Sequence, residues 1–114
     1  MKKIVFYEGD IKAFVNGRKA VLLKFGPSEL VLEGVLTKVF SGQDAKKGFE
    51  QIKRFISSAS FEVMVLDGFA DVLENSSYKE EIIIWLNDHQ SNDDFPHIAI
   101  TGGGKGKFPN LITE

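Results

Sequence analysis

The chain has 114 residues, of which 43% are hydrophobic and 26% are charged, and its formal net charge is −2. This length suffices for one domain with its own core, and the composition is that of a globular protein and not of a disordered one. The lack of cysteine excludes disulfides, thiolate metal sites and cysteine nucleophiles, and the negative charge argues against nucleic-acid binding.

The sequence also argues against a membrane or secretory location. No apolar run approaches the roughly 20 residues that a bilayer-spanning helix needs. Lys2 and Lys3 resemble the start of a signal peptide, but Glu8 and Asp10 interrupt the apolar run that follows them. We therefore expect a cytoplasmic protein that binds neither membrane nor nucleic acid.

Short apolar runs bounded by turn residues predict strands along the whole chain. Asn16 and Gly17 are typical of a tight turn after the first strand, and Gly34 of a turn or bulge between the third and fourth strands. The predicted strands span residues 3–7, 20–25, 30–32, 35–40, 61–66 and 97–101.

Two segments, residues 45–59 and 77–89, have the 3.6-residue periodicity of amphipathic helices. Each opens with the spacing of a capping box, in which a serine hydroxyl accepts a backbone N–H and a carboxylate reaches back. The capping residues are Ser41 and Asp44 for the first helix and Ser77 and Glu80 for the second. The β-branched residues 82–84 could also form a strand, but the flanking charges favour a helix.

Strands that alternate with helices predict a single α/β domain over residues 1–114. We expect a small three-layer fold with a mainly parallel sheet. The run of residues 61–66 is nearly all apolar, as expected of a central strand covered on both faces. The ten phenylalanines are expected to fill the core, and exposed platforms for stacking bases are the less favoured interpretation.

Asp67 directly follows a predicted central strand and precedes Gly68. In P-loop enzymes a carboxylate in this place binds the magnesium of the nucleotide. Asp67 is therefore a candidate metal ligand. The alternative is a carboxylate that caps the turn or faces solvent.

A glycine-lysine loop follows the last predicted strand. Backbone N–H groups of glycines and the charges of lysines both suit an anion. The match to the phosphate-loop motif is imperfect, because Phe108 replaces the hydroxyl residue and Pro109 follows it in place of a helix. The candidate ligand-binding residues here are Thr101, Gly102, Gly103, Gly104, Lys105 and Lys107.

Three further candidates, Gly9, Asp10 and Lys12, follow the first strand, where nucleotide-binding α/β proteins place their phosphate loop. The two histidines, His89 and His97, have no partners at metal-ligand spacing, so we expect structural roles for both.

Four motifs in the second half follow one another in a suggestive order. They are residues 63–67 (Val-Met-Val-Leu-Asp), 80–86 (Glu-Glu-Ile-Ile-Ile-Trp-Leu), 97–102 (His-Ile-Ala-Ile-Thr-Gly) and 111–114 (Leu-Ile-Thr-Glu). In order and spacing they resemble the ATP:corrinoid (cobalamin) adenosyltransferase family. That family has a strand ending Leu-Asp-Glu, a helix that opens with acidic residues, a strand ending Thr-Gly-x-Gly and a Leu-Val-Thr-Glu segment.

The resemblance implies a P-loop fold that binds ATP with magnesium and a corrinoid, and usually forms a homodimer. In the family, Gly-Lys-Gly-Lys-Thr-Thr and a helix follow the first strand. Here only Gly9 remains of that loop, and we expect the helix to be deleted and replaced by a short link through Asn16 and Gly17. Loss of the donors, the lysine and the hydroxyl should remove most affinity for a triphosphate.

Three hypotheses about function result. The first is a degenerate relative of these adenosyltransferases, without adenosyl transfer, that acts as a small-ligand or partner-binding module. The second is a nucleotide-binding enzyme in which Lys105 and Lys107 hold the phosphates and Asp67 holds the metal. The third is a structural or assembly domain, which an exposed apolar patch around Trp85 or the phenylalanines would favour.

Any ligand site is expected at one edge of the sheet, because the carboxyl ends of parallel strands all emerge on the same side. The residues expected to gather there are Gly9, Asp10, Asp67, Gly68, Thr101 and Gly102, with Lys105 and Lys107 within reach.

Overall fold

The computed structural model describes residues 2–40, 45–58, 60–103 and 106–113 of the chain. Its centre is a five-stranded sheet in the order β1-β5-β4-β2-β3, in which every pair of neighbours is parallel. The strands are β1 (Ile4–Phe6), β2 (Ala20–Lys24), β3 (Leu36–Val39), β4 (Val63–Asp67) and β5 (His97–Ile100). The predicted α/β class and parallel sheet are confirmed.

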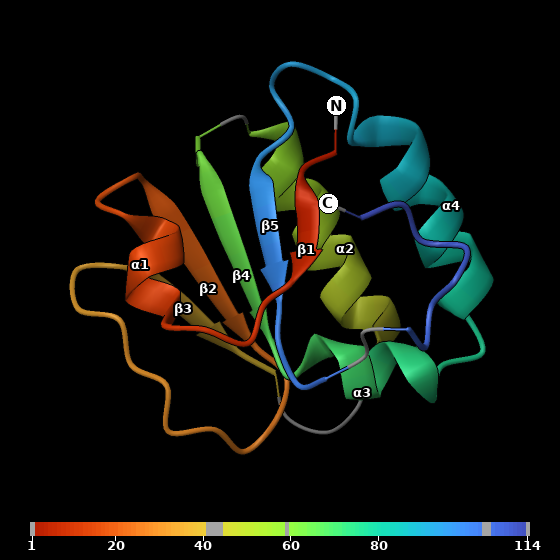
Figure 1. Ribbon diagram of the computed structural model, residues 1–114, viewed down its shortest axis with the longest axis horizontal. Helices are drawn as coiled ribbons and strands as arrows, with labels where there is room; N and C mark the ends of the chain where they lie inside the picture. The colour runs from red at the N-terminus through yellow and green to blue at the C-terminus, as the bar shows by residue number, and fades with distance from the viewer. Residues whose placement is uncertain (1, 41–44, 59, 104–105, 114) are drawn as a thin grey trace.

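Helices cover both faces of the sheet, so the fold has three layers (Figure 1). The short helix α1 lies in front of the sheet in this view, and α2 lies behind it. The helices are α1 (Ile11–Val15), α2 (Ala45–Ser57), α3 (Phe69–Glu74) and α4 (Lys79–His89). None of the described helices is both long and apolar enough to cross a membrane.

The alternation of side chains along the central strand β4 divides the core into two clusters. Met64 and Leu66 pack with α2, α3 and α4, whereas Val63 and Val65 pack with α1. All five residues of β4 are buried, as expected of a strand covered on both faces. The larger cluster holds the stacked rings of Phe25 and Phe40, whose centroids are 4.8 Å apart.

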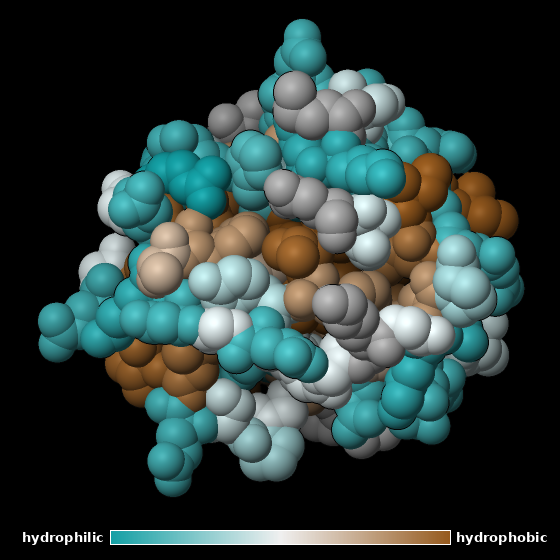
Figure 2. All heavy atoms as spheres, viewed as in Figure 1, coloured by the Kyte–Doolittle hydropathy of each residue, from teal (hydrophilic) through white to brown (hydrophobic). Residues whose placement is uncertain are grey.

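The phenylalanines fill the core, as predicted, and on the face that Figure 2 shows, hydrophilic residues lie around the hydrophobic ones. Each of the ten is buried or half-buried, and none is among the exposed large hydrophobic residues. Close packing extends to Gly48 on α2, where a Cβ atom would lie 2.2 Å from a ring carbon of Phe25. The two helices that the periodicity predicts are present as α2 and α4.

Two predictions for the first half of the chain are wrong. Residues 30–32 are not a strand: they belong to a loop that packs Leu32 on the α1 side and turns at Gly34, whose φ is +73°. The link expected between β1 and β2 contains the helix α1, which Asp10 caps at its start and Asn16 ends with a φ of +49°. A segment of five helical residues is too short to show a clear 3.6-residue period.

Two further differences concern the helices of the second half. The helix α3 was not predicted, because Phe69–Glu74 is also too short for a periodic pattern. The second capping box does not form: the hydroxyl of Ser76 accepts the N–H of Tyr78 at 3.0 Å, and α4 begins at Lys79. The first capping box, Ser41 with Asp44, lies outside the described residues, as does Ala59 at the predicted end of α2.

Two buried polar side chains join the ends of the chain to the fold. The ammonium group of Lys3, which is 6% exposed, donates to three backbone carbonyls of residues 92, 93 and 95 at 2.8–3.1 Å. The amide of Gln90 accepts the backbone N–H of Lys3 and donates to the carbonyl of Ile112. These bonds hold β1, the loop after α4 and the C-terminal segment together.

Candidate functional site

The carboxyl ends of β4 and β5 are joined by a polar pair. The hydroxyl of Thr101 donates to Oδ1 of Asp67 at 2.7 Å and accepts the N–H of Gly68 at 3.1 Å. The backbone continues the sheet here, because the N–H of Thr101 bonds to the carbonyl of Leu66 at 3.1 Å. Asp67 therefore ends its strand as predicted, and Thr101 holds one of its two carboxylate oxygens.

Asp67 and Thr101 belong to a row of polar residues that crosses four strands at one level. Asp67 pairs in register with Lys24 of β2, and the N–H of Tyr7, just beyond β1, bonds to the carbonyl of Ile100. By alternation along the strands, all four residues stand on the α1 side of the sheet. We call Tyr7, Thr101, Asp67 and Lys24 the carboxyl-edge row.

The second oxygen of Asp67 distinguishes this row from ordinary strand ends. Asp67 is 7% exposed, and its Oδ2 is a buried atom with no hydrogen-bond partner in the described protein. Its neighbour in register, Lys24, instead donates to the carbonyl of Ser28 at 2.8 Å. An unpaired oxygen of a buried carboxylate is costly, and such a group calls for a specific explanation.

Glycines let the strand ends approach one another closely at this edge. Gly102 has a φ of +97°, and a Cβ atom there would lie 3.1 Å from the Cα of Gly68. Gly68 has a φ of +77°, and a Cβ atom on it would lie 3.3 Å from the backbone nitrogen of Gly26. The ends of β2, β4 and β5 thus come together through backbone, which a larger residue would push apart.

An open hollow of about 360 Å³ lies at the same edge, beside Gly26 and Gly68, but no residue of the carboxyl-edge row lines it. Its apolar residues Phe25, Phe40 and Val72 belong to the cluster on the α2 side, whereas the row stands on the α1 side. The hollow lies between the ends of the neighbouring strands β2 and β4. After β2 the chain passes over the α1 side of the sheet, whereas after β4 it continues into α3 on the other side. Ligands of α/β proteins bind at such a reversal of direction. The hollow is lined by Phe25, Gly26, Pro27, Val39, Phe40, Gly68, Asp71 and Val72.

The candidates after β1 form no described hydrogen bond or ion pair with the carboxyl-edge row. Asp10 caps α1: its Oδ1 accepts the N–H of Lys12 at 3.0 Å, and its carbonyl accepts the N–H groups of Ala13 and Phe14. Gly9 packs beside the ring of Tyr7, and Lys12 is exposed. No hydrogen bond or ion pair in the described part of the chain links these three candidates to Asp67.

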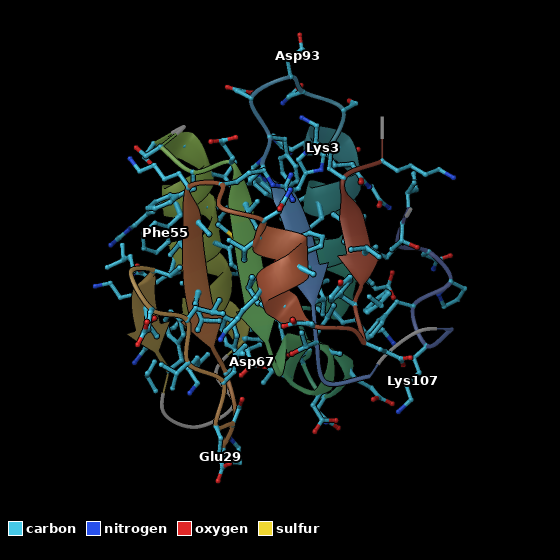
Figure 3. The ribbon with its side chains drawn as sticks, turned by 60° about the vertical axis from the view of Figure 1, so that its left-hand side comes forward. Lys3, Glu29, Phe55, Asp67, Asp93 and Lys107 are labelled. Carbon is cyan, nitrogen blue, oxygen red and sulfur yellow. The ribbon has the colours of Figure 1, made fainter. Side chains whose placement is uncertain are left out.

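The described lysine of the glycine-lysine loop, Lys107, pairs with an acid other than Asp67. Gly103 and Gly106 have positive φ angles, whereas Gly104 and Lys105 lie outside the described residues. Lys107 forms an ion pair of 3.3 Å with Glu74 at the end of α3. Figure 3 shows Asp67 and Lys107 apart from each other at this end of the molecule.

No preformed metal centre is visible in the described structure. Among the described residues, no group of three histidine, aspartate or glutamate side chains is placed to hold a metal ion. His89 stacks on Trp85 with the ring centroids 4.2 Å apart, and its Nδ1 lies 2.8 Å from the Trp85 carbonyl. That packing suits the structural role expected of His89.

The sequence interpretation overlooked two members of the row, Tyr7 and Lys24. A signal for both is present: each row residue is the polar residue at the end of an apolar strand. The structure thus brings together Asp67, Gly68, Thr101 and Gly102, and adds Tyr7 and Lys24 beside them.

The fold and the position of the candidate site define the class of this protein. It is a doubly wound α/β domain, and the candidate site lies at the carboxyl ends of its parallel strands. Comparisons with models of known protein families, with curated proteins and with solved structures find no match to this chain. The likeness to the corrinoid adenosyltransferases therefore rests on the sequence motifs.

Proposed function

We propose that the chain is a degenerate relative of the ATP:corrinoid adenosyltransferases that binds a small polar ligand at the carboxyl-edge row and does not transfer adenosyl groups. The observation that carries this proposal is the buried carboxylate of Asp67, with one oxygen bonded to Thr101 and the other unpaired. The ligand would supply a hydrogen-bond donor, such as an amine, amide or hydroxyl group, to Oδ2, which is buried in the free protein and would have to be uncovered on binding.

The loss of adenosyl transfer is argued from the start of α1. In the family that the chain resembles, the segment after the first strand holds the triphosphate through backbone N–H groups. Here the side chain and carbonyl of Asp10 accept the N–H groups of Lys12, Ala13 and Phe14. The carboxylate of Asp10 would also repel a phosphate bound at the start of α1, because two anions repel each other.

Ligand binding is argued from the cost of keeping Asp67. A buried, half-paired carboxylate destabilises a domain unless another group pairs with it. Such groups occur at functional sites more often than elsewhere, since proteins retain destabilising residues where activity needs them. The neighbouring glycines leave backbone exposed to an approaching ligand, as Gly102 and Gly103 are both exposed.

Calorimetry and a transfer assay test the proposal together. We expect no heat of binding with magnesium ATP and no adenosylation of a reduced corrinoid. A screen of small amines, amides and polyols by amide NMR shifts is expected to find binders that move the signals of Asp67, Gly68 and Thr101. The variant Asp67→Asn should lose these binders, because its amide places a donor where the ligand needs an acceptor.

Two results would contradict the proposal. Adenosyl transfer at the rate of an active family member would show that catalysis survives without the phosphate loop. Ligands that bind Asp67→Asn and the unchanged chain equally well would show that Oδ2 takes no part in binding.

A second candidate function keeps a nucleotide at the same edge. Its phosphates would bind Lys105 and Lys107, and Asp67 would face the metal. The Asp67–Thr101 pair and the close Gly68–Gly102 contact favour it, whereas the ion pair between Lys107 and Glu74 opposes it. Replacing both lysines by alanine should abolish nucleotide binding under this hypothesis, and an unchanged affinity would exclude it.

A further inference from the structure

The strand β3 forms an open edge of the sheet. All four of its residues are exposed, and two of them are apolar: Leu36 is 48% exposed and Val39 is 73% exposed. Its only sheet partner in the described structure is β2. An exposed edge of this kind is a template for an additional strand.

The pairing with β2 shows which backbone groups of β3 are free. The N–H of Phe40 bonds to the carbonyl of Lys24, so residues with even numbers point their backbone groups toward β2. In a parallel sheet the next residue points its groups the other way. Thr37 and Val39 therefore present their N–H and C=O groups at the open edge.

A groove of about 630 Å³ lies between β3 and α2, and it is basic. Its charged residues among those that the structure describes are Lys19, Lys38 and Arg54, and none of its described lining residues is acidic. Neither Lys38 nor Arg54 has an ion-pair partner within the described ranges. Figure 3 shows Phe55, an aromatic residue that lines the groove, on the side of the molecule where β3 lies.

The positive charge is local, because the whole chain has a net charge of −2. The helix beside the groove carries four cations and one acid, Glu50, which pairs with Lys53 at 3.1 Å. A positive surface on an acidic protein indicates a negatively charged partner.

We propose that β3 and this groove bind an extended acidic segment of a partner protein by strand addition. Its backbone would pair with Thr37 and Val39 at the open edge. Alternate side chains of the added strand would be acidic and face Lys38 and Arg54, on the α2 side. The remaining side chains would be apolar and lie on the other face, beside Thr37 and Val39.

A second copy of the chain is a poorer occupant of this edge. Pairing β3 with its own copy brings two sets of the same cations to one face of the joined sheet. The cations of the two copies would then repel each other, because like charges on neighbouring strands are destabilising. An acidic segment in the same position would instead be attracted to these cations.

The test uses a short soluble peptide that alternates glutamate and valine, and a control peptide with lysine in place of glutamate. We expect the acidic peptide alone to bind and to shift the amide NMR signals of Thr37 and Val39. The double variant Lys38→Glu with Arg54→Glu should weaken binding at least about tenfold and favour the lysine peptide. The double variant Lys2→Glu with Lys12→Glu changes two exposed cations outside the groove, so it is the control with the same change in net charge and should leave the affinity unchanged.

A backbone test separates strand addition from simple charge attraction. Val39→Pro removes one N–H at the open edge, where proline is tolerated, and should abolish binding while circular dichroism stays unchanged. If Val39→Pro instead fails to fold, the double variant Lys38→Glu with Arg54→Glu still tests the proposal. Equal binding of both peptides, no effect of charge reversal, or self-association through β3 at working concentration would overturn the proposal.

Discussion

The replacement Asp67→Asn tests whether the candidate site is maintained at the expense of stability. Asparagine has nearly the same shape as aspartate, and its Oδ1 can accept the hydroxyl of Thr101 as the carboxylate does at 2.7 Å. The change therefore preserves the hydrogen bond that the side chain of Asp67 makes within the described structure. It replaces the unpaired oxygen Oδ2 by a neutral amide nitrogen.

The expected direction of the change in stability follows from the burial of the Asp67 side chain. At 7% exposure the carboxylate has lost most of its hydration, and a neutral amide loses less when it is buried. We expect the free energy of unfolding to rise by about 1 kcal/mol, which is within the range common for single stabilising replacements. For a domain of this size that corresponds to a rise in Tm of about 4 °C.

Thr101→Val is the opposing variant, with nearly the same volume. It removes the donor to Asp67 and the acceptor for the Gly68 N–H together. Two hydrogen bonds, one of them to a charged group, are lost, so we expect a destabilisation of about 2–3 kcal/mol. Combining this variant with Asp67→Asn should recover part of that loss, because the remaining buried group is then neutral.

Urea unfolding, followed by circular dichroism, measures both changes, provided that the m-value stays constant. The reasoning is refuted if Asp67→Asn destabilises the domain by about 1 kcal/mol or more. The carboxylate would then have a stabilising partner in the folded protein, and the argument that its second oxygen awaits a ligand would fail.

Three further predictions concern the fold around the site. Lys3→Met should destabilise the domain by about 3 kcal/mol, because three carbonyls lose a buried ammonium donor; the exposed Lys2→Met is the control, and equal stability of the two variants would contradict the assignment. Gly102→Ala should cost about 2 kcal/mol in urea unfolding through backbone strain and contact with Gly68, and a neutral result would show that the edge can yield. Asp10→Ala should cost about 1 kcal/mol by removing the cap of α1, and faster amide exchange in that helix should accompany it.

The architecture of this protein could be predicted from its sequence because the decisive patterns are long and regular. The apolar run that becomes β4 and the amphipathic period of α2 each extend over enough residues to exclude the alternatives. The alternation of these elements then implies parallel strands with helices on both faces. Asp67 and Thr101 could be placed at one edge by the same reasoning, since both end parallel strands.

Short elements and side-chain partners could not be predicted in the same way. The helices α1 and α3 have too few residues for a period, and the loop before β3 has the composition of a strand. Nothing in the sequence shows that Asp10 takes up the N–H groups after β1, or that Lys107 pairs with Glu74. These partners depend on which segments the packed core brings within hydrogen-bond distance.

The sequence by itself therefore determined the fold class and the position of Asp67 at the carboxyl edge of the sheet, where the candidate site lies. Only the tertiary structure decided that, among the described residues, one oxygen of Asp67 is bonded and the other is not, and that Tyr7 and Lys24 stand in the same row. The physical reason is range: periodicity and turn signals are local along the chain, whereas the register between strands and the burial of each atom arise from contacts between distant segments.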